Sequence, residues 1–381
     1  MRAVRLHSGR PARALQGHPW AYAAEVEVLG QAPEDGEGVE LVDPRGRSLG
    51  SGIWNSKSQI VWRRYSMAPR RLDNVLLGDL LSAAIAHRQG APFTRLVHAE
   101  GDGLPGLIID RFGPLLSVQA NTLGMDIRLP AIIDHLRRLL SPDEIVLRND
   151  APVRRLEGLE LSVTTASGKP LAARRLDIGG LSWNVDLLGG QKTGLYLDQF
   201  VQHAKVAALA KGRRVLDAFC NQGGFGLACA KAGANSVLGL DLSEEAIAAA
   251  KANAAANKLR ADFEVANVFD WLRASEARFD LIVLDPPPFA RSKDALEGAL
   301  RGYKDITLRA FRLLAPGGIL ATYSCSQRVT ESLFQEVTES AAADARRNLR
   351  IIERAAQPPD HPELLNFPEG RYLKGLILEA I

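Results

Sequence analysis

The chain has 381 residues, too many for one ordinary hydrophobic core, so two or three domains are expected. Apolar residues make up 46% of the sequence and charged residues 24%, a balance typical of globular proteins, and no segment approaches the apolar run of a membrane span. The formal net charge of +3 is only weak support for a nucleic-acid partner, and the three cysteines and seven histidines have no spacing that indicates a disulfide framework or a metal site.

The first residues of the chain contain no export signal that we recognise. Residues 1–7 include basic side chains, but no apolar run or small-residue cleavage site follows them. We therefore expect a cytoplasmic protein that makes no contact with membranes.

Short strands separated by turns dominate the N-terminal part of the sequence. Strands are expected at residues 22–29, 39–42, 48–54 and 59–64, and this alternation predicts a small β-barrel over residues 1–72. Basic residues outnumber acidic ones here, and two pairs, Arg63 with Arg64 and Arg70 with Arg71, are candidates to meet the phosphates of a nucleic acid. A solvated charged face explains the charge pattern equally well.

The next segment mixes helical and strand patterns. Helices are expected at residues 74–89 and 124–140, and strands at residues 93–99, 107–111, 115–119 and 144–148. This order predicts a central α+β domain over residues 73–180.

A strand at residues 181–187 precedes a regular alternation of buried strands and longer helices that begins near residue 213. The strands are expected at residues 214–218, 236–240, 262–265, 281–285, 319–323, 350–353 and 373–378. The helix at 243–257 has Ser243 as its N-cap. The pattern predicts an α/β fold, a Rossmann-like, seven-stranded doubly wound sheet, over residues 181–381.

The first strand of that sheet leads into a glycine-containing loop and a helix. Asp217 ends the strand, and Gly223 and Gly224 let the backbone pass close to a ligand. The spacing differs from the dinucleotide fingerprint, and Asp217 stands where a carboxylate can face a cationic amino-acid group. Asp241 ends the next strand, where it can accept hydrogen bonds from ribose hydroxyls, and Asn267 follows the third, where an adenine would be contacted. Each Asp alone is commonly a turn residue, but their common register favours a ligand site.

Two further strand ends carry candidate catalytic residues. The fourth strand ends in Asp285, followed by three prolines and Phe289, and Cys325 follows the fifth strand. Neighbouring strands of a doubly wound sheet open onto one crevice, so Asp285 and Cys325 should lie together. A thiolate that adds to C6 of a pyrimidine makes C5 nucleophilic enough to accept a methyl group, and Asp285 can stabilise N3 during that addition. The alternative is an inert buried cysteine, which we expect for Cys229 and favour for Cys220.

The strand ends resemble class I methyltransferases, a likeness that implies S-adenosylmethionine as the cofactor. The whole chain resembles the PUA-domain-containing ribosomal RNA large-subunit methyltransferase I family, which makes 5-methylcytosine in 23S ribosomal RNA. The matching segments are residues 17–20, 102–107, 110–113, 192–199, 301–305, 324–326 and 361–375. The likeness covers nearly the entire chain and implies a PUA barrel that binds RNA.

The resemblance completes the set of predicted contacts. Catalytic roles fall to Cys325 and Asp285, with no metal. Cofactor contacts are predicted for Lys192, Thr193, Gln199, Asp217, Phe219, Asn221, Gly223, Gly224, Phe225, Asp241, Asn267, Val268 and Asp285. The expected partner is 23S ribosomal RNA or an assembling large subunit, and a homodimer is left open.

The sequence departs from the family pattern at three positions. Phe200 stands where relatives usually have Arg, Pro288 where they often have Lys, and Asn267 where they often have Asp. In amino-group methyltransferases an aromatic residue follows Asp-Pro-Pro directly, whereas Phe289 comes one residue later. Two alternatives therefore stay open: a guanine or adenine N-methyltransferase acting on ribosomal RNA, and a non-catalytic RNA-binding assembly factor.

Overall fold

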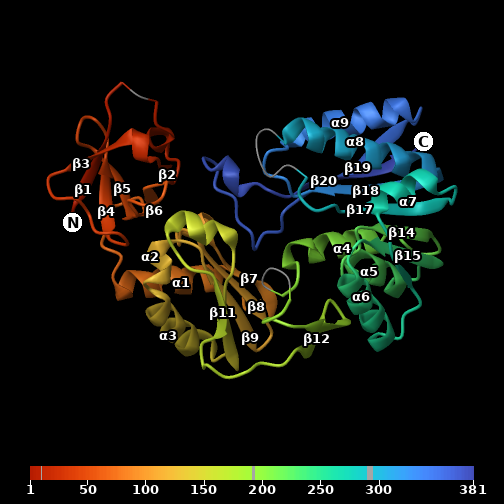
Figure 1. Ribbon diagram of the computed structural model, residues 1–381, viewed down its shortest axis with the longest axis horizontal. Helices are drawn as coiled ribbons and strands as arrows, with labels where there is room; N and C mark the ends of the chain where they lie inside the picture. The colour runs from red at the N-terminus through yellow and green to blue at the C-terminus, as the bar shows by residue number, and fades with distance from the viewer. Residues whose placement is uncertain (10, 191–193, 290–294) are drawn as a thin grey trace. The chain divides into compact units, whose positions relative to one another are not determined.

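Six short strands near the N-terminus form one sheet in the computed structural model, which describes residues 1–9, 11–190, 194–289 and 295–381 (Figure 1). Its spatial order is β2-β6-β5-β4-β1-β3. The strands are β1 (Ala3–Leu6), β2 (Trp20–Ala21), β3 (Val26–Leu29), β4 (Gly38–Val42), β5 (Ser48–Trp54) and β6 (Trp62–Ser66). Trp62 is fully buried, and its indole N–H donates to the Val39 carbonyl at 3.0 Å, so the sheet closes over an apolar core.

The single strand expected at residues 22–29 is wrong. The chain leaves β2 at Ala21, turns through a 3₁₀ helix (Ala23–Glu25) and only then enters β3. The Glu25 carboxylate accepts the Tyr22 backbone N–H at 2.8 Å, a reciprocal cap that stabilises this turn.

A second sheet of five strands, in the order β11-β10-β9-β8-β7, forms the centre of the next region. Its strands are β7 (Phe93–His98), β8 (Leu107–Phe112), β9 (Leu115–Ala120), β10 (Glu144–Asn149) and β11 (Ser162–Thr165), and its helices are α1 (Asn74–His87), α2 (Leu123–Asp126) and α3 (Leu129–Leu140). Leu77 and Leu81 of α1 and Leu136 of α3 join the buried cluster with residues of the sheet. The α+β pattern is therefore present in this part of the chain.

The continuous helix expected at residues 124–140 is also wrong, because two helices occupy that stretch. Pro130 lies in the first turn of α3, where its missing N–H costs nothing, but the same residue inside a continuous helix would remove a hydrogen bond and clash with the preceding turn. The helix therefore breaks around Arg128, which caps α3.

A seven-stranded sheet in the order β16-β15-β14-β17-β18-β20-β19 forms the C-terminal region, as the sequence predicts. Its strands are β14 (Arg214–Ala218), β15 (Ser236–Asp241), β16 (Asp262–Val265), β17 (Phe279–Leu284), β18 (Leu314–Ser324), β19 (Leu349–Ala356) and β20 (Lys374–Ala380). The first five are parallel, and β20 runs antiparallel to both β18 and β19. The strand order reverses beside β14, which places the carboxyl ends of β14 and β17 at the topological switch point.

Helices cover both faces of this sheet (Figure 1). They are α4 (Phe200–Ala207), α5 (Gly224–Lys231), α6 (Glu244–Ala256), α7 (Val268–Ala274), α8 (Leu296–Leu313) and α9 (Glu331–Asp344). The Ser243 hydroxyl accepts the Ala246 N–H at 3.1 Å, which confirms the predicted N-cap of α6.

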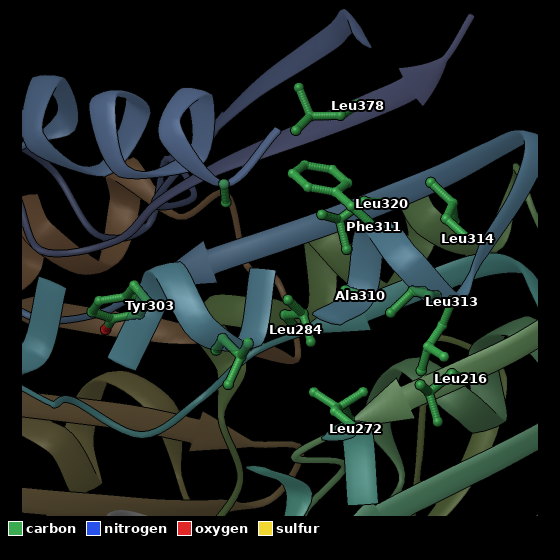
Figure 2. Close-up of a cluster of buried hydrophobic side chains, with 14 of the residues drawn as sticks. Leu216, Leu272, Leu284, Tyr303, Ala310, Phe311, Leu313, Leu314, Leu320 and Leu378 are labelled. Carbon is green, nitrogen blue, oxygen red and sulfur yellow. The ribbon is translucent and has the colours of Figure 1, made fainter. Parts of the chain in front are cut away.

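Residues along each strand alternate between two buried clusters. Leu216, Leu320 and Leu378 belong to the cluster that includes α7, α8 and α9, and Figure 2 shows Leu320 and Leu378 beside Phe311 of α8. Val215 and Ile377 belong to the cluster under α4 and α5. The position of a residue along its strand therefore tells whether its side chain faces α7, α8 and α9 or faces α4 and α5.

The chain divides into two compact units. One comprises Met1–Leu176, Val185–Leu197 and Pro359–Gly370, and the other comprises Asp177–Asn184, Asp198–Pro358 and Arg371–Ile381. The hairpin β12 (Arg174–Ile178) and β13 (Leu181–Val185) lies where the chain passes between them. The three-domain division at residues 72/73 and 180/181 stays a prediction. None of the helices in the described segments is long and apolar enough to cross a membrane.

Candidate cofactor and catalytic site

The loop after β14 has an unusual backbone. Phe219 has φ +67°, Asn221 has φ +47° and Gly223 has φ +86°, so three residues within five adopt the left-handed conformation. This region is unfavourable for an aromatic residue such as Phe219, and strain of this kind collects at ligand sites. Gly223 accommodates its conformation because it has no Cβ.

Asp217 lies beneath this loop with no exposure to solvent. The Gly226 N–H donates to its Oδ2 at 2.7 Å, whereas its Oδ1 has no hydrogen-bond partner among the described residues. Burial raises the pKa of Asp217 to about 7, the Gly226 hydrogen bond opposes the shift, and the nearby Asp241 charge adds to it. A buried carboxyl oxygen without a partner is suited to receive a cationic group.

Asp241 ties the loop to the end of β15. Its Oδ2 accepts the Asn221 N–H at 2.9 Å, and its Oδ1 accepts the Ser243 N–H at 3.0 Å. Each carboxylate oxygen has a second lone pair, so the group can still accept hydrogen bonds from a ribose. Leu242, which sequence reasoning missed, follows directly and is 71% exposed. An exposed large apolar side chain beside a polar anchor is suited to cover a planar ring.

The other predicted contacts of the loop region have several environments. Asn267 is exposed and caps α7, with its Oδ1 accepting the Phe269 N–H at 3.0 Å. Val268 and Phe225 are core residues, 3% exposed each, so they offer little surface to a cofactor. Gly224 is closely covered, since a Cβ there would stand 2.5 Å from His203. Lys192 and Thr193 lie outside the described residues.

Gln199 and Asp285 lie together. The Gln199 Nε2 donates to Asp285 Oδ2 at 2.9 Å, and Gln199 is only 5% exposed, so the amide fixes the carboxylate. The Asp285 backbone N–H lies 3.5 Å from the Ala218 carbonyl, which brings the loop after β17 beside the loop after β14. Phe200, the departure from the family pattern, packs edge-on against Trp183 with 5.9 Å between ring centroids.

The aromatic side chain after the three prolines is held by its neighbours. Phe289 lies 4.7 Å from Tyr303 and 5.7 Å from Phe269 between ring centroids, and Phe219 completes the group at 6.5 Å. Sequence reasoning singled out Phe289 and the segment 301–305 that contains Tyr303, but nothing in the sequence showed that the two rings pack together.

Cys325 differs from the other two cysteines. Cys220 and Cys229 are buried, and burial raises the pKa of both thiols, in agreement with the inert role expected for them. Cys325 is partly exposed and directly follows Ser324, the last residue of β18. Because β17 and β18 are parallel neighbours with Leu284 opposite Thr322, Asp285 and Cys325 emerge from adjacent strand ends.

The four predicted RNA contacts fall into two groups. Arg63 is 12% exposed, and its guanidinium pairs with Glu157 at 3.0 Å and with Glu100 at 3.4 Å. Arg64 donates to the Gly17 carbonyl at 2.6 Å. Arg70 and Arg71 are exposed. The geometry therefore gives Arg63 a structural environment and leaves Arg70 and Arg71 as the better candidates for phosphate contacts.

We expect Arg63→Ala to destabilise the protein by about 3 kcal/mol, because it leaves the buried Glu157 carboxylate without its charged partner. The double variant Arg70→Ala/Arg71→Ala should leave the free energy of unfolding within about 0.5 kcal/mol of wild type, as is usual for exposed sites, and weaken RNA binding in low salt. Denaturant titration and filter binding check both. A fully stable Arg63→Ala variant with weakened RNA binding would reverse the assignment.

No group of three or more potential metal ligands occurs among the residues that the structure describes. The donor set gathered at the strand ends, carboxylates with an amide and an apolar side chain, instead fits the ammonium, ribose and base of a nucleoside amino acid.

Two family models match the chain. Residues 159–377 match the S-adenosylmethionine-dependent methyltransferase model, and residues 4–67 match the PUA-like domain model. The methyltransferase match covers the seven-stranded sheet and its strand-end loops, and the PUA-like match covers the N-terminal sheet.

Curated relatives match over their full length. A ribosomal RNA large subunit methyltransferase I of Tolumonas auensis is 41% identical, covering 99% of both chains. Proteins of the same name from Aeromonas salmonicida and Photobacterium profundum are 40% and 38% identical, covering 99% and 98% of both chains.

Solved structures share the fold over the whole chain. A SAM-dependent methyltransferase from Streptococcus mutans has a TM-score of 0.82 at 20% identity, covering 100% of both chains. A methyltransferase structure in complex with S-adenosylhomocysteine has a TM-score of 0.83 at 21% identity, with the same coverage. S-adenosylmethionine is accordingly the cofactor of this protein. With the methyltransferase fold and full-length relatives in agreement, the chain belongs to the ribosomal RNA large subunit methyltransferase I family.

Proposed function

We propose that the protein methylates C5 of a cytosine in 23S ribosomal RNA through a covalent bond between Cys325 and C6 of the base. The observation that carries the proposal is the position of Cys325. It is the partly exposed cysteine of the three, and it follows β18 next to the strand that ends before Asp285. Methylation of an exocyclic amine requires no thiol at this position.

The proposed reaction has four steps: addition of the thiolate, methyl transfer, proton removal and release of the thiolate. The Cys325 thiolate adds to C6 of the cytosine, and the ring electrons move toward N3 and C5. C5 then attacks the methyl carbon that bound S-adenosylmethionine would supply, and the S–CH₃ bond breaks with its electron pair left on sulfur, so that S-adenosylhomocysteine is the leaving group. A base removes the proton from C5, and the electrons of that C–H bond re-form the C5–C6 double bond as the thiolate leaves. The Cys325 thiolate is thereby regenerated, and the base returns to its starting state once it passes the C5 proton to solvent.

Asp285 supports the first step. When protonated, its carboxyl group, oriented by the Gln199 amide at 2.9 Å, can donate its proton to N3, where negative charge develops as the thiolate adds, and take the proton back when the thiolate leaves. The backbone contact from Asp285 to Ala218 keeps this group beside the cofactor loop. A carboxyl group fixed before the reaction needs no reorganisation as the charge appears.

The environment of Phe289 supports C5 rather than an exocyclic amine as the acceptor. In amino-group methyltransferases the aromatic residue follows Asp-Pro-Pro directly, one position before that of Phe289. Phe289 packs against Tyr303 and Phe269, so protein contacts take up part of its ring surface.

The choice of ribosomal RNA rests on the names of the full-length relatives and on the PUA-like match at residues 4–67. Exposed Arg70 and Arg71, just beyond that match, are suited to phosphate contacts. A cytosine within a helix must leave its stack before C5 and C6 become accessible to Cys325.

Nucleoside mass spectrometry of ribosomal RNA tests the proposal. RNA from cells that lack the gene should be missing one 5-methylcytosine, and purified protein with the cofactor should restore it. Restoration of a methylated guanine or adenine would identify an N-methyltransferase instead. Unchanged RNA together with undetectable cofactor binding would indicate an RNA-binding assembly factor.

A further inference from the structure

We infer that Lys374 and Tyr303 are positioning residues that hold the turn containing Cys325 and keep its thiolate stabilised for attack. The inference rests on the proposed function for its catalytic meaning, although the position and charge state of the thiol can be measured independently. Neither residue is expected to touch the RNA, because both are buried: Tyr303 is 1% and Lys374 is 5% exposed.

Strand alternation places Ser324, which precedes Cys325, and Lys374 on the same face of the sheet. Leu320 and Leu378 face α8, so Ser324 and Lys374, each four residues away on the same strand, face it too. Ser324 and Lys374 also stand directly opposite each other in the antiparallel pairing of β18 with β20. Ser324, the last residue of β18, therefore has Lys374 beside it on the neighbouring strand β20, and helix α8 covers both residues.

Tyr303 anchors the turn from the helix side. Its hydroxyl accepts a hydrogen bond from the Ser324 hydroxyl at 2.9 Å and lies 3.0 Å from the Ser326 Oγ. Ser324 and Ser326, on either side of Cys325, are thus both bound to the buried Tyr303 hydroxyl, and Figure 2 shows Tyr303 in the buried cluster with the other side chains of α8. The same ring packs on Phe289, so Tyr303 links the turn after β18 to the loop after β17.

Lys374, the first residue of β20, also anchors the turn. Its ammonium donates to the Ser326 carbonyl and to the Val329 carbonyl, each at 2.7 Å. These bonds span the backbone immediately after Cys325 and fix the path of the chain toward α9. A buried backbone carbonyl without such a donor would be costly, so the lysine has a structural reason to stay in place.

Lys374 also carries charge close to the thiol. Burial lowers the pKa of Lys374 to about 8, and the charges of a Cys325 thiolate and of Glu331 oppose this shift. The amine is still mostly protonated at neutral pH, and it loses its charge as the pH rises through about 8. The coupling is mutual, so a cationic Lys374 favours the Cys325 thiolate. Tyr303 adds no competing negative charge, because burial raises the pKa of its phenol.

The pH dependence of Cys325 alkylation by iodoacetamide, followed by mass spectrometry of the Cys325 peptide in the full chain, tests the charge effect. We expect Lys374→Gln, which keeps amide N–H donors but removes the charge, to move the half-maximal pH up by about one unit. Lys374→Arg, which keeps the charge, should have a half-maximal pH close to that of wild type. Lys205→Gln is the control, because Lys205 of α4 is a partly exposed lysine that pairs with Glu353 of β19.

A matched pair of tyrosines tests the positioning effect. Tyr303→Phe removes the hydroxyl that binds both serines and should lower kcat about tenfold, with KM for RNA and cofactor unchanged. Tyr323→Phe removes an equally buried hydroxyl that has no hydrogen-bond partner in the described part of the chain, and should leave kcat as in wild type.

Two results would overturn the inference: an unchanged alkylation midpoint in a folded Lys374→Gln variant, or an unchanged kcat in Tyr303→Phe. Failure of Lys374→Gln to fold leaves the Tyr303→Phe result to decide. The proposed function fails separately, if Cys325→Ala remains active while the alkylation midpoint still responds to Lys374.

Discussion

Cys325→Ala is expected to lower methyl transfer by about 10⁴-fold or more, because without the thiolate C5 of cytosine is too weak a nucleophile to accept the methyl group. Affinity for S-adenosylmethionine should change by less than about threefold, which is under about 1 kcal/mol, since Cys325 is not among the predicted cofactor contacts. Single-turnover assays with radiolabelled cofactor and isothermal titration calorimetry measure the two quantities.

Cys229→Ala is the matched control. Cys229 lies within α5 and is fully buried in an apolar cluster, so its loss should leave turnover at the wild-type rate. A Cys325→Ala variant that methylates as fast as Cys229→Ala would exclude the covalent mechanism and favour transfer to an exocyclic nitrogen.

Asp217→Asn is expected to weaken cofactor binding by about 100-fold near pH 8 and to abolish its pH dependence. Burial holds the pKa of Asp217 at about 7 in the free protein. Below that pH the carboxyl group is protonated and must lose its proton before it can pair with the ammonium of the cofactor. Wild-type affinity should therefore fall about tenfold for each unit below pH 7 and level off above it.

Calorimetry in buffers of different ionisation enthalpy measures the proton released on binding. Asp280→Asn is the control, because Asp280 pairs with Arg214 near the beginning of β17, whereas the predicted cofactor contacts follow the carboxyl ends of the strands. The assignment is wrong if wild-type affinity is flat between about pH 6 and about pH 8, or if Asp217→Asn retains the same slope as wild type.

The same pKa shift has a consequence for folding. A carboxyl whose pKa is raised in the folded state binds more protons there than in the unfolded chain, between the ordinary value of 3.8 and about 7. Without cofactor, the contribution of Asp217 to stability therefore declines as the pH rises through this window. We expect saturating cofactor to reduce that decline, because it stabilises the ionised form.

The strand ends of the C-terminal sheet could be predicted because parallel strands impose a simple rule. β14 and β16 lie at the predicted residues, and the carboxyl ends of parallel strands meet at one edge. Asp217, Asp241 and Asp285 could be selected from the sequence on that basis alone. Their hydrogen-bond partners could not, since Gln199 lies 86 residues from Asp285.

Residues whose role depends on distant partners escaped sequence reasoning. Arg63 has the same local appearance as Arg70, and only the approach of Glu157, 94 residues away, distinguishes it. Tyr303 has the spacing of a core residue of α8, which it is, and its hydroxyl becomes significant only beside Ser324 and Ser326. Lys374 belongs to a short tail motif, and strand pairing brings it opposite Ser324.

Trapping the covalent intermediate tests the central claim most directly. In RNA that carries 5-fluorocytosine at the target position, C5 has no proton to lose after methyl transfer, so the thiolate cannot leave. With S-adenosylmethionine present, the account predicts a stable protein–RNA adduct whose digestion places the RNA mass on the Cys325 peptide, and no adduct with Cys325→Ala. Methylation of unmodified RNA by a protein that forms no adduct with the fluorinated RNA, or an adduct on any other residue, would contradict it.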